Sequence, residues 1–135
     1  AKMSINAWAS IPLRFSLGVM FIAHGLQKAY GMFAGSGIKN FSDMLSSLGF
    51  TPPLLWAYLA AYLELIGGFC LLIGLGTRIF SGLLFILIAI AAVTVHLRNG
   101  FFLMNGGVEY TFIIAAMCLS LAILGSGKFG LNKKL

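Results

Sequence analysis

Four apolar stretches long enough to cross a bilayer run through this 135-residue chain. They cover about residues 8–29, 54–75, 79–97 and 108–124. Each approaches the ~20 residues with which a helix crosses ~30 Å of hydrocarbon. Inside lipid, backbone groups must bond within their own segment, so an open chain crosses as helices. The sequence therefore predicts an all-α, polytopic membrane protein, a four-transmembrane-helix bundle that forms one domain over residues 1–135.

Composition supports this class and argues against others. Hydrophobic residues make up 60% of the chain and charged residues 9%, whereas about a quarter of a soluble domain is charged. The net charge of +6 does not indicate nucleic-acid binding, because the basic residues are scattered and form no patch with aromatics. We therefore predict contact with the lipid bilayer and none with nucleic acid. The first stretch contains Arg14 and no convincing cleavage site, so we expect it to be retained rather than removed as a signal peptide.

Basic residues at and beyond the ends of the stretches predict the orientation. Four crossings place both termini on one side of the membrane. The basic residues on that side are Lys2, Arg78, Lys128, Lys133 and Lys134. Those on the opposite, outer side are Lys28, Lys39 and Arg98. Because basic residues favour the inside, we expect both termini in the cytoplasm and the chain in the cytoplasmic (inner) membrane of a bacterium or archaeon.

The first outer loop contains a short amphipathic segment at about residues 38–48. Ile38, Phe41 and Leu45 fall on one face of a helix, and Lys39 and Asp43 fall on the other. Glycine and a proline pair follow the segment and end it. We expect an interfacial helix that lies on the outer surface of the membrane.

Two ionisable residues, Arg14 and Glu64, lie deep in the first and second stretches. A charge at this depth is costly, so by default it is paired and faces the protein interior. On a rise of 1.5 Å per residue, the two differ in depth by roughly one arginine side chain. We therefore predict an intramembrane ion pair. The pair could fix helix register, or Glu64 could relay protons or bind a polar headgroup, and both interpretations stay open.

A second polar group lies nearer the outer boundary. We expect His24, Lys28, His96, Arg98 and Glu109 to form an outer vestibule beneath the amphipathic loop, because they fall at the outer ends of the stretches. The candidate catalytic residues are His24, His96 and Glu109. The candidate substrate-binding residues are Lys28, Arg98, Asn99, Phe101 and Phe102.

Several short motifs follow one another along the chain. They are Arg14-x-x-x-Gly18, Gly25-x-x-Lys28, Glu64-x-x-Gly67-Gly68, Gly74-x-Gly76-Thr77-Arg78, His96-x-x-Asn99-Gly100-Phe101-Phe102, Gly106-Gly107-x-Glu109-Tyr110 and Gly125-x-Gly127. Their ordered set resembles the DoxX family over nearly the whole chain. The family includes small membrane subunits related to a thiosulfate:quinone oxidoreductase. The resemblance implies the four-span fold and a link to membrane redox complexes, while many members have no assigned activity.

No cofactor is encoded by a motif in the chain. The sequence has neither a G-x-G-x-x-G pattern nor a P-loop. His24 and His96 differ in depth, which disfavours a haem between them, and no local spacing supports a metal bound by them with Glu109, so no metal site is predicted. Cys70 and Cys118 lie roughly 9 Å apart in depth, too far for a disulfide, and we expect both in the core. A lipid-soluble quinone remains possible, since aromatics and protonatable groups accompany each other in the vestibule.

Three functions from different classes remain open on the sequence alone. The first, which the resemblance favours, is a DoxX-type membrane subunit of a redox complex that carries out quinone-linked electron transfer with a partner subunit. The second is a non-catalytic subunit that anchors or assembles a larger complex, or a homo-oligomer, through small-residue helix faces. The third is a carrier of protons or small molecules along the Arg14–Glu64 column.

Overall fold

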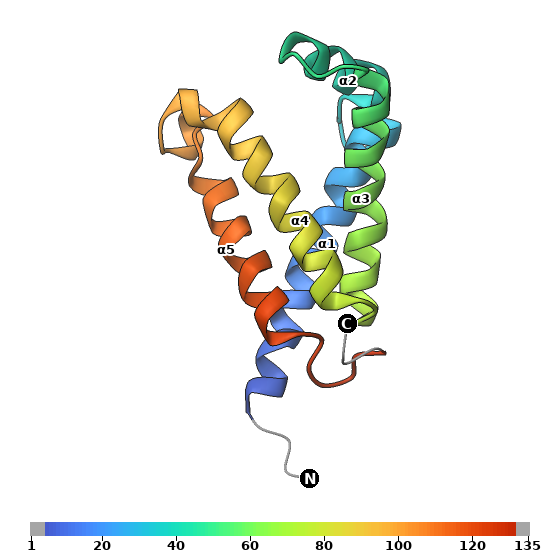
Figure 1. The fold of residues 1–135 in the computed structure, drawn as a ribbon, viewed down its shortest axis with the longest axis vertical. Helices are drawn as coiled ribbons and strands as arrows, with labels where there is room; N and C mark the ends of the chain where they lie inside the picture. The colour runs from blue at the N-terminus through green and yellow to red at the C-terminus, as the bar shows by residue number, and fades with distance from the viewer. Residues whose placement is uncertain (1–4, 132–135) are drawn as a thin grey trace.

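Residues 5–131 fold into five α-helices joined by short turns (Figure 1). The computed structural model describes residues 5–131, so Lys2, Lys133 and Lys134, which contribute to the expected orientation, lie outside the described residues. The helices are α1 (Asn6–Tyr30), α2 (Gly37–Ser47), α3 (Pro53–Ile73), α4 (Thr77–Ala91) and α5 (Glu109–Leu124). Helix α4 continues through a π-helical turn, η1 (Ala92–His96), and a 3₁₀ turn, η2 (Leu97–Asn99), and a second 3₁₀ turn, η3 (Leu103–Asn105), precedes α5.

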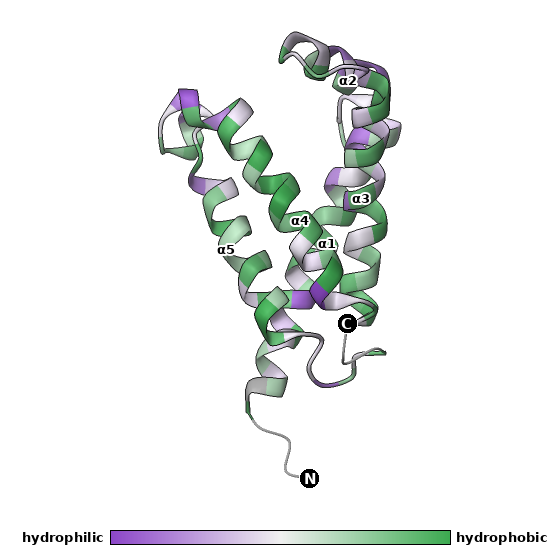
Figure 2. Cartoon of the chain, in the orientation of Figure 1, coloured by the Kyte–Doolittle hydropathy of each residue, from purple (hydrophilic) through white to green (hydrophobic). Residues whose placement is uncertain are grey.

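Within residues 5–131, three helices have the length and composition of membrane spans. Helix α1 from Ala7, α3, and α4 extended to Asn99 are each long and apolar enough to cross a bilayer. Helix α5 is also apolar but has only 16 residues. Hydrophobic residues cover most of the length of these helices, and hydrophilic ones gather toward their ends (Figure 2). The predicted all-α membrane fold is confirmed. The third apolar helix ends at Asn99, two residues beyond the expected end of its stretch, because η1 and η2 prolong α4.

Two antiparallel helix pairs make up the bundle. Helix α1 packs mainly on α3, and α4 packs mainly on α5, while contacts of α3 with α4 and of α1 with α5 join the two pairs. Helix α1 begins, and α5 ends, at what we call the terminal end of the bundle; α2 lies at the opposite end, the α2 end (Figure 1). Buried Leu17, Phe21, Leu71, Leu84 and Leu121 fill the space between the helices.

Glycines let α1 and α3 touch backbone to backbone. A Cβ atom on Gly68 would lie 2.8 Å from the carbonyl oxygen of Gly18, and one on Gly25 would lie 2.8 Å from the backbone nitrogen of Leu65. Real Cβ contacts are longer, so any larger residue at these positions would push the helices apart. Small residues of this kind are what close packing of helices in a membrane requires. The polar side chains on α1 are therefore held close to the backbone of α3.

Helix α2 covers the end of the α1–α3 pair. Phe41 and Leu45 are buried on its inner face and pack with Ala57 of α3. Lys39 and Asp43 are exposed on its outer face. The helix spans residues 37–47, where the amphipathic pattern predicted 38–48. It thus closes the α2 end of the α1–α3 pair.

Candidate functional site

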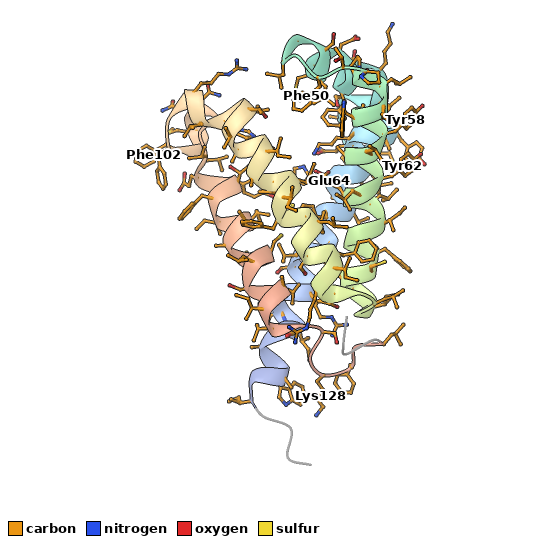
Figure 3. All side chains as sticks on the ribbon, viewed as in Figure 1. Phe50, Tyr58, Tyr62, Glu64, Phe102 and Lys128 are labelled. Atoms are coloured by element: carbon orange, nitrogen blue, oxygen red, sulfur yellow. The ribbon has the colours of Figure 1, made fainter. Side chains whose placement is uncertain are left out.

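An ion pair joins α1 and α3 at the α2 end of the bundle. Lys28 Nζ donates a hydrogen bond to Glu64 Oε1, and the two groups form a salt bridge. Glu64 is 1% exposed and lies inside the bundle, whereas Tyr58 and Tyr62 of the same helix lie on its outer side (Figure 3). The Lys28 ammonium also lies 5.3 Å from the ring centroid of Phe41 in α2. Lys28 therefore links three helices through one charged group.

The second oxygen of the Glu64 carboxylate is unusual. Glu64 Oε2 is buried and accepts no hydrogen bond from any residue in the described range 5–131. Buried polar atoms are normally hydrogen-bonded, and an unpaired acceptor costs about 1–3 kcal/mol. An atom of this kind requires an explanation, such as a group that occupies the site when the protein functions.

His24 and Tyr110 complete a polar group around this pair. His24 precedes Lys28 by one helical turn on α1, and its Nε2 lies 3.5 Å from the hydroxyl oxygen of Tyr110 in α5. The ring centroids are 6.2 Å apart. Both side chains lie near enough to Glu64 to interact with its charge. We call His24, Lys28, Glu64 and Tyr110 the Glu64 cluster; its members come from three helices, α1, α3 and α5.

Arg14 lies at the other end and does not pair with Glu64. It is 5% exposed, and its guanidinium donates four hydrogen bonds of 3.0 Å to backbone carbonyls. The acceptors are Leu71 and Leu72 in the last turn of α3 and Ser126 and Lys128 after α5. The last carbonyls of a helix have no partner within the helix, so they need donors such as these. The predicted Arg14–Glu64 ion pair is wrong.

Side-chain direction explains the error. Side chains in a helix lean toward its N-terminus. Helix α1 runs from the terminal end to the α2 end, so Arg14 leans away from Glu64 and Lys28 leans toward it. Helix α3 runs the opposite way, so Glu64 leans toward the α2 end, where Lys28 lies. The depth count compared α-carbon positions and ignored this direction.

The expected vestibule is divided between two places in the structure. His24 and Lys28 belong to the Glu64 cluster. His96 and Asn99, in contrast, bind the carbonyl oxygen of Gly106, through Nδ1 at 2.9 Å and Nδ2 at 3.2 Å. Glu109 Oε2 accepts a hydrogen bond of 2.8 Å from the backbone nitrogen of Leu103. These three side chains hold the turn between α4 and α5, so the grouping of all five vestibule residues is wrong.

The remaining candidate substrate-binding residues lie on the surface of that turn. Arg98, Phe101 and Phe102 are exposed. The two phenylalanine rings pack edge to face with centroids 5.3 Å apart, and Phe102 points away from the bundle (Figure 3). The expected contact of these residues with His24 is not formed. Among the described residues, His24, His96 and Glu109 also form no cluster that could hold a metal ion.

Sequence reasoning missed Tyr110 and misplaced Lys28. Tyr110 follows Glu109 directly on α5, and a step of ~100° along the helix makes the two side chains point in different directions. A choice of candidate residues by charge selects Glu109 and passes over the uncharged Tyr110. The α-carbon of Lys28 lies near the end of α1, as the sequence predicts, but the long side chain reaches inward to Glu64. Cys70 and Cys118 are buried and unbonded to each other, and Cys118 packs in the main core.

Known proteins are similar in sequence to the helices described above. The DoxX family model matches residues 9–97, which contain all of α2 to α4, α1 except its first three residues, and three of the four members of the Glu64 cluster. A protein of Bacillus subtilis (strain 168) named "Putative oxidoreductase CatD" is 38% identical over 115 residues, which cover 84% of this chain and 77% of that protein. No solved structure matches the chain significantly. On these matches, and on a fold of apolar helices that carries the motifs in order, the chain belongs to the DoxX family.

Proposed function

We propose that this chain is a quinone-linked oxidoreductase subunit of the bacterial or archaeal cytoplasmic membrane, and that the Glu64 cluster handles the protons of the quinone. The name of the Bacillus relative supports redox activity in general. The observation that carries the proposal is the buried, unpartnered Glu64 Oε2 beside Lys28 and His24. Quinone heads are apolar rings with oxygens, so a site for them needs a few polar groups in apolar surroundings.

The polar atoms of the cluster fit both redox forms of such a ring. Glu64 Oε2 is a free acceptor, which suits the hydroxyl of a quinol. Lys28 has three N–H donors and uses one on Glu64, which leaves donors for a quinone carbonyl. A bound quinone would supply the redox chemistry, since it takes up two electrons and two protons to become a quinol.

The residues of the chain then have separate roles in the proposal. Glu64 holds or gives up a proton at Oε2, Lys28 orients a carbonyl oxygen and balances the carboxylate charge, and His24 with Tyr110 forms a second protonatable pair at 3.5 Å. Helices α1 and α3 keep these groups in fixed register through their glycine contacts. The electrons come from a reduced partner protein, because redox chemistry in the membrane requires a donor that this chain does not encode by motif. If the termini lie in the cytoplasm, the cluster lies toward the outer side of the membrane.

Quinone bound to purified protein in lipid nanodiscs tests the proposal. We expect extractable quinone with wild type, and a loss of at least ten-fold in quinone affinity with Glu64→Gln, which keeps the shape but removes the carboxylate. Asp43→Asn makes the same chemical change on the exposed face of α2 and should leave affinity unchanged. Glu109→Gln should also retain affinity, because Glu109 binds the turn backbone rather than the cluster.

Three results would count against this function. Equal quinone affinity of wild type and Glu64→Gln would remove the cluster from the reaction. A co-purified partner with no quinone, together with tolerance of Glu64→Gln, would support the anchor or assembly role instead. Proton or solute flux through sealed vesicles that depends on Glu64 would support a carrier.

A further inference from the structure

The turn between α4 and α5 presents four consecutive large apolar side chains to the outside. Phe101, Phe102, Leu103 and Met104 are all exposed, and Met104 is 93% exposed. Exposed Arg98 precedes them. We call residues 97–108 the outer hairpin. An apolar run of this size on a soluble surface would be a liability, so something covers it.

The backbone of the outer hairpin is tied together by hydrogen bonds. The nitrogens of Val108 and Glu109 bond the carbonyls of Gly100 and Phe101 at 3.0 and 2.7 Å, and Gly107 bonds Phe102 at 2.9 Å. The side chains of His96, Asn99 and Glu109 add their hydrogen bonds to the backbone of the same turn. Irregular backbone inside the hydrocarbon needs its polar groups satisfied. These bonds pair many of the polar groups of the hairpin backbone, which suits a place at the membrane interface, where water reaches the others.

Helix lengths place the hairpin at the edge of the hydrocarbon. Arg78 Nη1 donates a hydrogen bond of 2.9 Å to the carbonyl of Ile123, so α4 begins level with the end of α5. From there α4 with η1 and η2 runs 23 residues to Asn99, or about 34 Å, whereas the 16 residues of α5 span only about 24 Å. A hydrocarbon core of about 30 Å exceeds α5 by about 6 Å, and the descending hairpin fills that part of the fourth crossing.

We propose that the outer hairpin is a preformed lipid anchor, which seats Phe101 to Met104 at the boundary between headgroups and acyl chains of the outer leaflet. Exposed Arg98 provides a charge complementary to lipid phosphates at that level. The hairpin also ends short of α2 along the long axis of the bundle (Figure 1), as expected if α2 lies on the membrane surface and the hairpin lies in it. This assigns a lipid surface, not substrate, to Arg98, Phe101 and Phe102, three of the residues that the sequence suggested for substrate binding.

Nitroxide labels on single introduced cysteines in proteoliposomes of phosphatidylcholine and phosphatidylglycerol test the anchor. Cys70 and Cys118 are buried, so a surface cysteine can be labelled selectively. Met104→Cys carries the test label, Lys39→Cys on the outer face of α2 is the water reference, and Ile86→Cys on the exposed face of α4 is the hydrocarbon reference. Phe102→Cys serves as a second test site if Met104→Cys does not assemble.

We expect the Met104 label to be several-fold less accessible than the Lys39 label to a water-soluble nickel relaxation agent, and several-fold more accessible to oxygen. Its oxygen accessibility should stay below that of the Ile86 label, which lies deeper. A Met104 label as accessible to nickel as the Lys39 label would overturn the proposal and make the hairpin a water-exposed docking surface for a protein. These results do not depend on quinone, so the anchor and the proposed function can fail separately.

Discussion

Arg14 and Glu64 are charged side chains buried toward opposite ends of the bundle, and they differ in how far their hydrogen bonds are satisfied. At the terminal end, Arg14 donates four hydrogen bonds to backbone carbonyls of two different segments. At the α2 end, Glu64 has one oxygen on Lys28 and one oxygen without a partner in the described chain. A satisfied polar network rigidifies, whereas a partly satisfied one marks a place where binding or chemistry is expected. We infer that the terminal end holds the fold together and the α2 end serves function.

The largest expected effect is the loss of Arg14. Each hydrogen bond from a charged donor contributes about 1.5–3 kcal/mol, and Arg14→Met removes four. We expect a greater loss of unfolding free energy than with any single substitution at the α2 end, measured by sodium dodecyl sulfate titration in mixed micelles. Arg78→Met is the matched control, because Arg78 also bonds a carbonyl but is exposed, and it should change stability by under about 1 kcal/mol. Equal losses in the two variants would contradict the assignment of the terminal end.

Removal of Lys28 should rank second. Lys28→Met leaves the Glu64 carboxylate buried without its cation, and an uncompensated buried charge costs about 3–5 kcal/mol. The double variant Lys28→Met/Glu64→Gln should recover most of that loss, since no charge then remains. A double-mutant cycle on unfolding free energy measures the coupling. Strictly additive losses would show that the pair contributes nothing through its charges.

Sequence was a good guide to the helices and a poor one to the charge partners. Hydropathy located the spans within a few residues, because transfer into lipid depends on the composition of each segment alone. The partners of Arg14 could not be predicted by pairing acidic with basic side chains. Its acceptors are backbone carbonyl oxygens in the last turn of α3 and after α5. The Lys28–Glu64 pair was within reach, because opposite helix directions make both side chains lean toward each other. A depth count gives similar depths to residues at the ends of different spans and does not say which of them are in contact. It therefore grouped residues of the outer hairpin with His24.

Substitutions at two glycines on α1 test the difference between the terminal end and the α2 end of the bundle. Gly18→Ala would bring a Cβ atom to 2.8 Å from the Gly68 carbonyl, toward the terminal end. Gly25→Ala would bring one to 2.8 Å from the Leu65 nitrogen, next to Glu64. Overpacking costs about 1–3 kcal/mol, so both should lose stability to a similar degree. Only Gly25→Ala should also weaken quinone binding in nanodiscs, because it displaces α3 beside the cluster.

Gly82→Ala controls for the substitution itself. Nothing lies within 4 Å of a Cβ atom at this position on α4, so stability should stay unchanged or rise by up to about 1 kcal/mol through helix propensity. If Gly18→Ala reduced quinone binding as much as Gly25→Ala, the two ends would be coupled through the α1–α3 contact, and the division between a structural and a functional end would be wrong.

The smallest effect on stability, and the most specific effect on function, is expected at Tyr110. Tyr110→Phe removes only the hydroxyl that faces His24 Nε2 at 3.5 Å, a long contact that contributes no more than about 1 kcal/mol to folding. If His24 and Tyr110 form a protonatable pair beside Glu64, the rate of quinone reduction with the reduced partner protein as electron donor should fall several-fold. Quinone affinity should stay near that of wild type. Tyr30→Phe removes a hydroxyl bonded to Tyr62 at 2.8 Å, between α1 and α3 and outside the cluster, and it should leave the rate unchanged. A rate reduced equally by both variants would trace the effect to packing around the tyrosines and would remove the Tyr110 hydroxyl from proton transfer.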